Sequence, residues 1–130
     1  LPVTGQSFLL AEDNLVNQKV AVGILRKLGI TLDVVGNGKE AVELIQQRKY
    51  DYVFMDVQMP EIDGLEATQL IRQMDSIQQP YIIAMTANAM SEDRDLCLDV
   101  GMNDFIAKPL RLEDVHKALA SALESRKHLH

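Results

Sequence analysis

Cysteine occurs only once among the 130 residues, at Cys97. A single thiol excludes an internal disulfide, so a reducing compartment fits the composition best. No apolar run approaches the roughly 18 residues of a membrane span, and the start of the chain does not resemble a signal peptide. These absences lead us to expect a cytoplasmic domain, whether or not its parent protein is anchored in a membrane.

An excess of positive charge is also absent: 13 Lys and Arg stand against 19 Asp and Glu, and the formal net charge is -6. This balance argues against a nucleic-acid surface as the main partner. Neither a glycine-rich phosphate loop nor a cofactor motif is present. What remains is ordinary for a soluble globular chain, with 47% apolar and 25% charged residues. The length fits one domain that buries roughly two-thirds of its unfolded surface.

Short apolar segments alternate with longer segments of helical periodicity. The apolar segments predict strands over residues 7–11, 31–35, 52–56, 81–85 and 104–107. The periodic segments predict helices over residues 15–28, around 41–45, 64–74, 90–100 and 112–123. Such alternation predicts an α/β fold, a three-layer flavodoxin-like (βα)5 sandwich whose parallel five-stranded sheet has the order 2-1-3-4-5.

Polar residues follow four of these strands directly. Glu12 and Asp13 come after the first strand, Asp56 ends the third, Thr86 follows the fourth and Lys108 follows the fifth. In the predicted order these strand ends lie at one mouth of the sheet. Three carboxylates there repel one another by about 4 kcal/mol per pair near 4 Å at an effective dielectric of 20. Lys108 offsets part of this charge, and an oxygen-rich site of this kind suits Mg²⁺.

Each residue also has a simpler interpretation. Asp56 alone is typical of a turn or cap that closes a strand. Glu12 and Asp13 could be solvated acids near a helix start, Thr86 a turn residue and Lys108 a surface charge. These interpretations leave unexplained why all of them follow strands that share one mouth. We therefore favour a functional site.

The same residues, with Lys108-Pro109 and the segment Met59–Gly64, resemble the receiver domain of two-component response regulators. The resemblance covers residues 6–125, which leaves residues 1–5 as a linker remnant and 126–130 as a C-terminal tail. The segments 12–18 and 85–90 are most similar to receivers of hybrid sensor histidine kinases. The resemblance implies that this domain is a phosphoprotein of a phosphorelay. Such a domain catalyses its own phosphorylation and dephosphorylation.

The resemblance assigns roles to individual residues. Asp56 would be the phosphoacceptor, and Mg²⁺, with Mn²⁺ as a substitute, would be held by Asp13, Asp56 and the backbone carbonyl of Gln58. Glu12 would act on the metal through water; it replaces an Asp found in many relatives, which leaves the metal affinity open.

Further residues would bind the phosphoryl group and transmit the signal. Thr86, Lys108 and the backbone N–H of Ala87 would bind it, and Thr86 with Phe105 would form the switch. The resemblance also implies a cis peptide bond between Lys108 and Pro109. Gln58 and Asn88 flank the site and are expected to tune hydrolysis of the phosphate.

The expected partner is a histidine kinase or a histidine phosphotransfer protein, docking beside the first helix. We expect no nucleic-acid or membrane contact, and we leave open a weak homodimer. Two other functions stay open: a phosphate-ester hydrolase and a binding module that is not phosphorylated. Phosphate-ester hydrolases that use an aspartyl phosphate usually carry the nucleophile on the first strand, whereas Asp56 ends the third. The presence of Asp56, Thr86 and Lys108 argues against a binding module that is not phosphorylated.

Overall fold

The computed structural model describes residues 5–87 and 91–127. Strands and helices alternate along the chain: β1 (Phe8–Ala11), α1 (Leu15–Lys27), β2 (Asp33–Val35), α2 (Gly38–Gln47), β3 (Tyr52–Asp56), α3 (Gly64–Arg72), β4 (Tyr81–Thr86), α4 (Ser91–Asp99), β5 (Asp104–Ala107) and α5 (Leu112–Lys127). Within the described ranges, no helix is both long and apolar enough to cross a bilayer.

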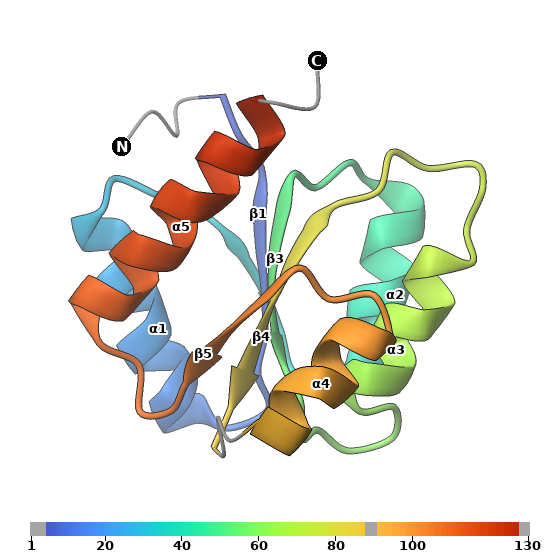
Figure 1. Ribbon diagram of the computed structural model, residues 1–130, viewed down its shortest axis with the longest axis horizontal. Coiled ribbons are helices and arrows are strands. Elements are labelled where there is room, and N and C mark those ends of the chain that lie inside the picture. The colour runs from blue at the N-terminus through green and yellow to red at the C-terminus, as the bar shows by residue number, and fades with distance from the viewer. Residues whose placement is uncertain (1–4, 88–90, 128–130) are drawn as a thin grey trace.

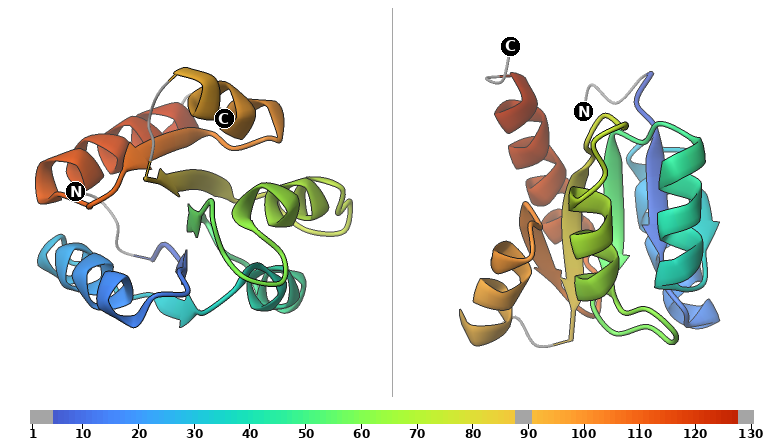
Figure 2. Two further views of the ribbon diagram at one scale, coloured as in Figure 1. Left: turned by 90° about the horizontal axis from the view of Figure 1, so that it is seen from below. Right: turned by 90° about the vertical axis from the view of Figure 1, so that its right-hand side faces the viewer.

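The five strands form one sheet in the order β2-β1-β3-β4-β5, and each neighbouring pair is parallel. Helices α1 and α5 cover one face, and α2, α3 and α4 cover the other (Figures 1 and 2). Parallel strands joined by helical crossovers have to be covered on both faces, which explains why β3 is buried along its whole length. The predicted three-layer fold and strand order are confirmed.

Alternate residues of the central strands enter two separate cores. Phe54 of β3 and Ile83 of β4 pack in the core beneath α1 and α5. Val53 and Ala84 pack in the core beneath α2, α3 and α4. Because successive side chains of a strand point to opposite faces, a continuous apolar run supplies both cores at once.

Helix α1 begins at Leu15, as the sequence predicts, and ends at Lys27, one residue before the predicted end. The side chain of Asn14 caps it by accepting a hydrogen bond from the N–H of Asn17, at 3.0 Å. Gly29, with a φ of +83°, reverses the chain after its last turn. The final helix continues beyond the apolar pattern that predicted it, to Lys127.

Some predicted boundaries are wrong by one or two residues. The predicted strands 7–11 and 31–35 begin later, at Phe8 and Asp33. Since β2 lies at the edge of the sheet and pairs only with β1, its ladder contains only three residue pairs. The predicted helix 64–74 ends at Arg72, and α4 runs over Ser91–Asp99. Position 90, where that helix was predicted to start, lies outside the described residues.

Candidate functional site

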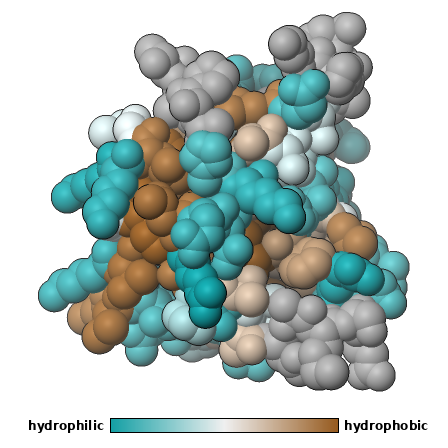
Figure 3. Space-filling view, turned by 60° about the vertical axis from the view of Figure 1, so that its left-hand side comes forward, coloured by the Kyte–Doolittle hydropathy of each residue, from teal (hydrophilic) through white to brown (hydrophobic). Residues whose placement is uncertain are grey.

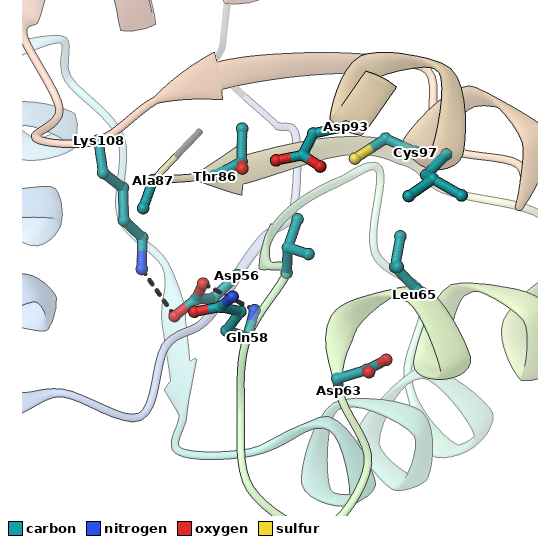
Figure 4. A pocket seen from close by; sticks show the side chains of 11 residues that line it. Asp56, Gln58, Asp63, Leu65, Thr86, Ala87, Asp93, Cys97 and Lys108 are labelled. Carbon is teal, nitrogen blue, oxygen red and sulfur yellow. Dashed lines mark hydrogen bonds and ion pairs between the residues drawn. The ribbon is translucent and has the colours of Figure 1, made fainter. Parts of the chain in front are cut away.

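The polar residues that follow the strands meet at the carboxyl edge of the sheet, as predicted (Figure 4). Asp56, Gln58, Thr86, Ala87 and Lys108 line one cavity of about 280 Å³. Parallel pairing brings their strands to a common end, with Asp56 level with Met85 and Thr86 level with Ala107. The topology therefore creates the site from segments that are far apart in the sequence.

Three acids cluster beside this cavity. Each of Glu12, Asp13 and Asp56 offers a carboxylate oxygen, and these oxygens lie within 4.8 Å of one another. Asp13 is exposed, whereas Glu12 and Asp56 are only 1% and 3% exposed. A set of oxygen donors with one solvent-facing member matches the preference of Mg²⁺ for carboxylates and retained waters.

Lys108 supplies the positive charge within this cluster. Its Nζ lies 2.8 Å from Asp56 Oδ2 and 3.3 Å from Glu12 Oε1. The same ammonium thus bridges both buried acids, and Figure 4 shows it reaching across to Asp56. Burial alone would lower the pKa of Lys108, but the hydrogen bond and charge of Asp56, with a smaller contribution from Glu12, raise it above its usual value. Lys108 is therefore fully charged at neutral pH.

Glu12 responds differently to the same surroundings. Burial, and then the nearby Asp56 carboxyl, raise the pKa of Glu12 from 4.5 to about 7, against the opposing effects of a hydrogen bond with Asn17 and of the Lys108 charge. One lysine does not neutralise two buried carboxylates, and with this raised pKa the Glu12 carboxyl takes up a proton near pH 7. A bound divalent cation would remove this conflict.

Backbone hydrogen bonds hold the loop after β3 in place. The N–H of Val57 donates to the carbonyl of Met85 at 3.0 Å, which fixes the loop to β4. The N–H of Gln58 donates to Asp56 Oδ1 at 3.2 Å and orients the carboxylate. On the other side, the N–H of Lys108 donates to the carbonyl of Thr86 at 2.8 Å and joins β4 to the end of β5. The peptide bond between Lys108 and Pro109 is cis, as predicted.

Gly64 makes a contact that the sequence did not reveal. A Cβ at this position would lie 2.1 Å from the carbonyl oxygen of Asp56 and 3.0 Å from Cγ of Met55. The sequence predicts only that a helix begins at Gly64. The structure adds a second requirement, because only glycine lets α3 start directly against the backbone of Asp56.

The predicted switch residues lie on adjacent strands. Phe105 is paired with Ala84, two residues before Thr86, so Phe105 and Thr86 lie on the same face of the sheet. Thr86 is buried and Phe105 is half-buried. The guanidinium of Arg94, on α4, lies 5.7 Å from the centre of the Phe105 ring. This cation–π contact joins α4 to β5 and was not foreseen.

Helices α3 and α4 complete the wall of the cavity, where Leu65, Asp93 and Cys97 lie (Figure 4). Cys97 is only 1% exposed and belongs to the core, which fits its interpretation as a packing residue. Burial, followed by the charge of Asp93, raises the pKa of its thiol. His116 is exposed on α5, and Asn88 lies outside the described residues.

Comparison with known proteins agrees with this arrangement. A family model for the response regulator receiver domain matches residues 8–120. The hybrid signal transduction histidine kinase K of Dictyostelium discoideum is 43% identical over 91% of this chain, which spans 10% of that protein. The histidine kinase BarA of Escherichia coli K12 is 37% identical over 92% of this chain, which spans 14% of it.

Two solved structures are also similar. The receiver domain of a Pseudomonas aeruginosa sensor histidine kinase, with magnesium coordinated in its active site cleft, is 40% identical with a TM-score of 0.84; the match covers 93% of this chain and 99% of that one. The Saccharomyces cerevisiae receiver domain of Ssk1, co-crystallised with the histidine phosphotransfer protein Ypd1, is 32% identical with a TM-score of 0.79, covering 87% and 85%. The chain belongs to the response regulator receiver domain family of two-component signalling systems.

Proposed function

We propose that this domain takes a phosphoryl group from a phosphohistidine onto Asp56, in a reaction that requires Mg²⁺. The observation that carries the proposal is the position of Asp56. Its carboxylate is buried at the end of β3, faces the cavity shared with Thr86, and is bound by the Lys108 ammonium at 2.8 Å. A carboxylate held in this way is positioned as a nucleophile and has a cation beside it to offset new charge.

The reaction is a displacement at phosphorus. An oxygen of Asp56 forms the new P–O bond, the P–N bond to the donor imidazole breaks, and that imidazole takes up a proton from solvent. Lys108 then pairs with the phosphoryl oxygens in place of the free carboxylate. The hydroxyl of Thr86 and the N–H of Ala87 donate further hydrogen bonds from the adjoining wall of the cavity. Positioning and charge neutralisation of this kind account for most catalysis of phosphoryl transfer.

We infer that Asp13, Asp56 and the carbonyl of Gln58 hold the metal, with Glu12 acting through water. The clustering of the three carboxylates within 4.8 Å supports this set. Bound Mg²⁺, or Mn²⁺ in its place, would neutralise charge on the transferring phosphoryl oxygens. A magnesium ion occupies the active site cleft of the similar Pseudomonas receiver, which further supports the proposal.

An apolar patch on α1 supports docking of a histidine phosphotransfer protein or of the histidine-bearing helices of a kinase. The helical spacing of apolar residues places Val16 and Val20 on the same face of α1 as its buried residues. Even so, the side chains of Val16 and Val20 are 68% and 43% exposed, and the neighbouring Leu15 is 71% exposed. Figure 3 shows apolar side chains gathered on the side of the molecule that carries α1 and α5. Val20 also lines a small groove with Pro109, next to Glu12 and Lys108. A helix docked on this patch would bring its histidine to the mouth of the site.

The parent protein is proposed to be a hybrid histidine kinase that presents this domain to the cytoplasm. The support is that hybrid signal transduction histidine kinases are among the similar proteins, of which this chain spans only 6–10%.

The experiment is phosphorylation by acetyl phosphate, followed by intact mass. We expect the wild-type protein to gain one phosphoryl group in Mg²⁺ and none in EDTA. Asp13→Asn should lose at least about tenfold in Mg²⁺ affinity and label correspondingly slowly, because it removes a charged ligand. Labelling that is indifferent to chelation would refute the proposal. Steady release of phosphate without accumulation of a labelled protein would instead favour a hydrolase.

A further inference from the structure

Gly38, the first residue of α2, touches the loop that follows β3. A Cβ at this position would lie 2.1 Å from the carbonyl oxygen of Ile62 and 2.9 Å from its carbonyl carbon. The backbone of Gly38 does not have the positive φ found at Gly29. The absence of a side chain at Gly38 is therefore required by the close approach of two backbones, and not by the backbone conformation.

The loop touched by Gly38 also carries the proposed metal-binding carbonyl of Gln58. The loop is closed at its base by a hydrogen bond from the N–H of Gly64 to the carbonyl of Val57, at 3.0 Å. Between Val57 and Gly64 the chain reverses direction at Glu61, which has a φ of +65°. Because the loop is short and closed, a displacement at Ile62 is transmitted to Gln58.

Of the two segments in contact, helix α2 is held more firmly than the loop that follows β3. The side chain of Asn37 caps its first turn by accepting from the N–H of Glu40 at 2.8 Å. Ala41 and Ile45 fix it in the core, with exposed fractions of 0% and 3%. A methyl group at residue 38 would therefore push the loop and leave the helix in place.

We propose that Gly38 is a positioning residue for the metal site. It lets α2 rest directly on the carbonyl of Ile62, and this contact sets the place of the Gln58 carbonyl relative to Asp56. The inference rests on the proposed function, since it takes the Gln58 carbonyl to be a metal ligand. Residues outside the first coordination shell commonly change metal affinity by 10–100-fold when they are substituted.

The test compares Gly38→Ala with two other glycine substitutions. Gly36→Ala places a methyl 3.6 Å from Glu40 Oε1, an ordinary contact, in the turn that precedes α2. Gly23→Ala adds a methyl group on α1, and no heavy atom lies within 4 Å of that methyl position. Mg²⁺ affinity is measured by titration, and the thermal unfolding midpoint is measured in EDTA. We expect Gly38→Ala to weaken Mg²⁺ binding about tenfold at a temperature where all variants are folded. The two control variants should stay within about twofold of wild type.

A second measurement uses only the wild-type protein and so does not depend on whether the variants fold. On Mg²⁺ titration, the amide resonances of Gly38 and Ile62 should shift together with that of Gln58, while that of Gly23 should not. An unmoved Gly38 amide would overturn the inference, and so would wild-type Mg²⁺ affinity in Gly38→Ala. Either result would leave the proposed function standing. A wild-type protein that binds no Mg²⁺ would overturn both.

Discussion

Glu12 determines how the acid cluster responds to pH when no metal ion is bound. Its pKa is raised from 4.5 to about 7 by burial and by Asp56. Between these values the folded protein holds a proton that the unfolded chain has released. The contribution of Glu12 to stability is thus greatest below about pH 4.5 and is lost as the pH rises through about 7.

We expect Glu12→Gln to stabilise the metal-free protein at pH 8 by about 1–2 kcal/mol, because it removes a buried charge that a single lysine does not neutralise. The change should also flatten the fall in stability between about pH 5 and pH 7. Thermal unfolding in EDTA across this range measures both effects. Glu113→Gln, a substitution of an exposed acid on α5, is the control and should leave the slope unchanged. An unaltered slope in Glu12→Gln would contradict the assignment.

At the scale of single residues, the sequence predicted which groups meet but not how they pair. Asp56 and Thr86 end their strands and Lys108 directly follows β5, so the strand order was enough to bring them together. The bridge from Lys108 to Glu12 depends on side-chain conformations. The contact of Gly64 with the Asp56 carbonyl depends on how closely two backbones approach. Periodicity and residue type carry no information on either.

At the scale of elements, the proposed switch would join β4, β5 and α4. A phosphoryl group would draw Thr86 toward Asp56 through a charge-assisted hydrogen bond of roughly 1.5–3 kcal/mol. The space that Thr86 leaves lies on the face of the sheet that also carries Phe105. Movement of the Phe105 ring would break its contact with Arg94 and so alter the surface of α4.

We therefore expect beryllofluoride, a phosphoryl mimic, to shift the amide resonances around Phe105 strongly in wild type and weakly in Thr86→Ala. Thr31→Ala changes an exposed threonine away from the site and should behave as wild type. NMR spectra with and without the mimic provide the comparison. Equal shifts around Phe105 in wild type and Thr86→Ala would show that Thr86 does not transmit the signal.

Helix α1 allows docking to be separated from chemistry. Val16→Glu places a charge in the exposed apolar patch and should slow phosphotransfer from a histidine phosphotransfer protein at least about tenfold. Labelling by acetyl phosphate, which needs no docking surface, should be unchanged. Leu98→Glu, on α4, is the matched control because Leu98 is 47% exposed. Loss of phosphotransfer in both variants, or in neither, would argue against docking on α1.

At the scale of the whole molecule, Arg72 ties together segments that are distant in the sequence. Its guanidinium donates to the carbonyls of Pro80 and Gly101 and to the side-chain oxygen of Asn103, each at 2.8 Å. Burial lowers its pKa. These partners are uncharged oxygens, so the arginine joins α3 to the starts of β4 and β5 without a carboxylate.

Arg72→Met should lower the free energy of unfolding by about 2–4 kcal/mol, because it leaves several partly buried carbonyls without a donor. Arg72→Lys should restore little of this, since an ammonium cannot reproduce the planar set of donors. Urea denaturation measures the change, with the exposed Arg26→Met as control. A loss below about 0.5 kcal/mol would show that the network contributes little to stability.

The fold as a whole was predictable because the apolar strand segments and the helical segments between them indicate the same α/β architecture. Fully buried, largely apolar strands such as Tyr52–Asp56 require cover on both faces, and the helical segments between strands provide it. The length of β2 was not predictable, because an edge strand pairs only as far as its neighbour allows. The Arg72 network was not predictable either, since it depends on loops that have no periodic pattern.

The most direct test of the central claim is to locate the phosphoryl group. Wild type, Asp56→Asn and Asp93→Asn are incubated with a phosphohistidine donor and Mg²⁺, and then analysed by intact mass and peptide mapping. Asp93 lines the same cavity but lies on α4 and not at a strand end, so its variant is the matched control. We predict one phosphoryl group in wild type and in Asp93→Asn, on the peptide that contains Asp56, and none in Asp56→Asn. Labelling that persists in Asp56→Asn, or that maps to His116, would contradict the account.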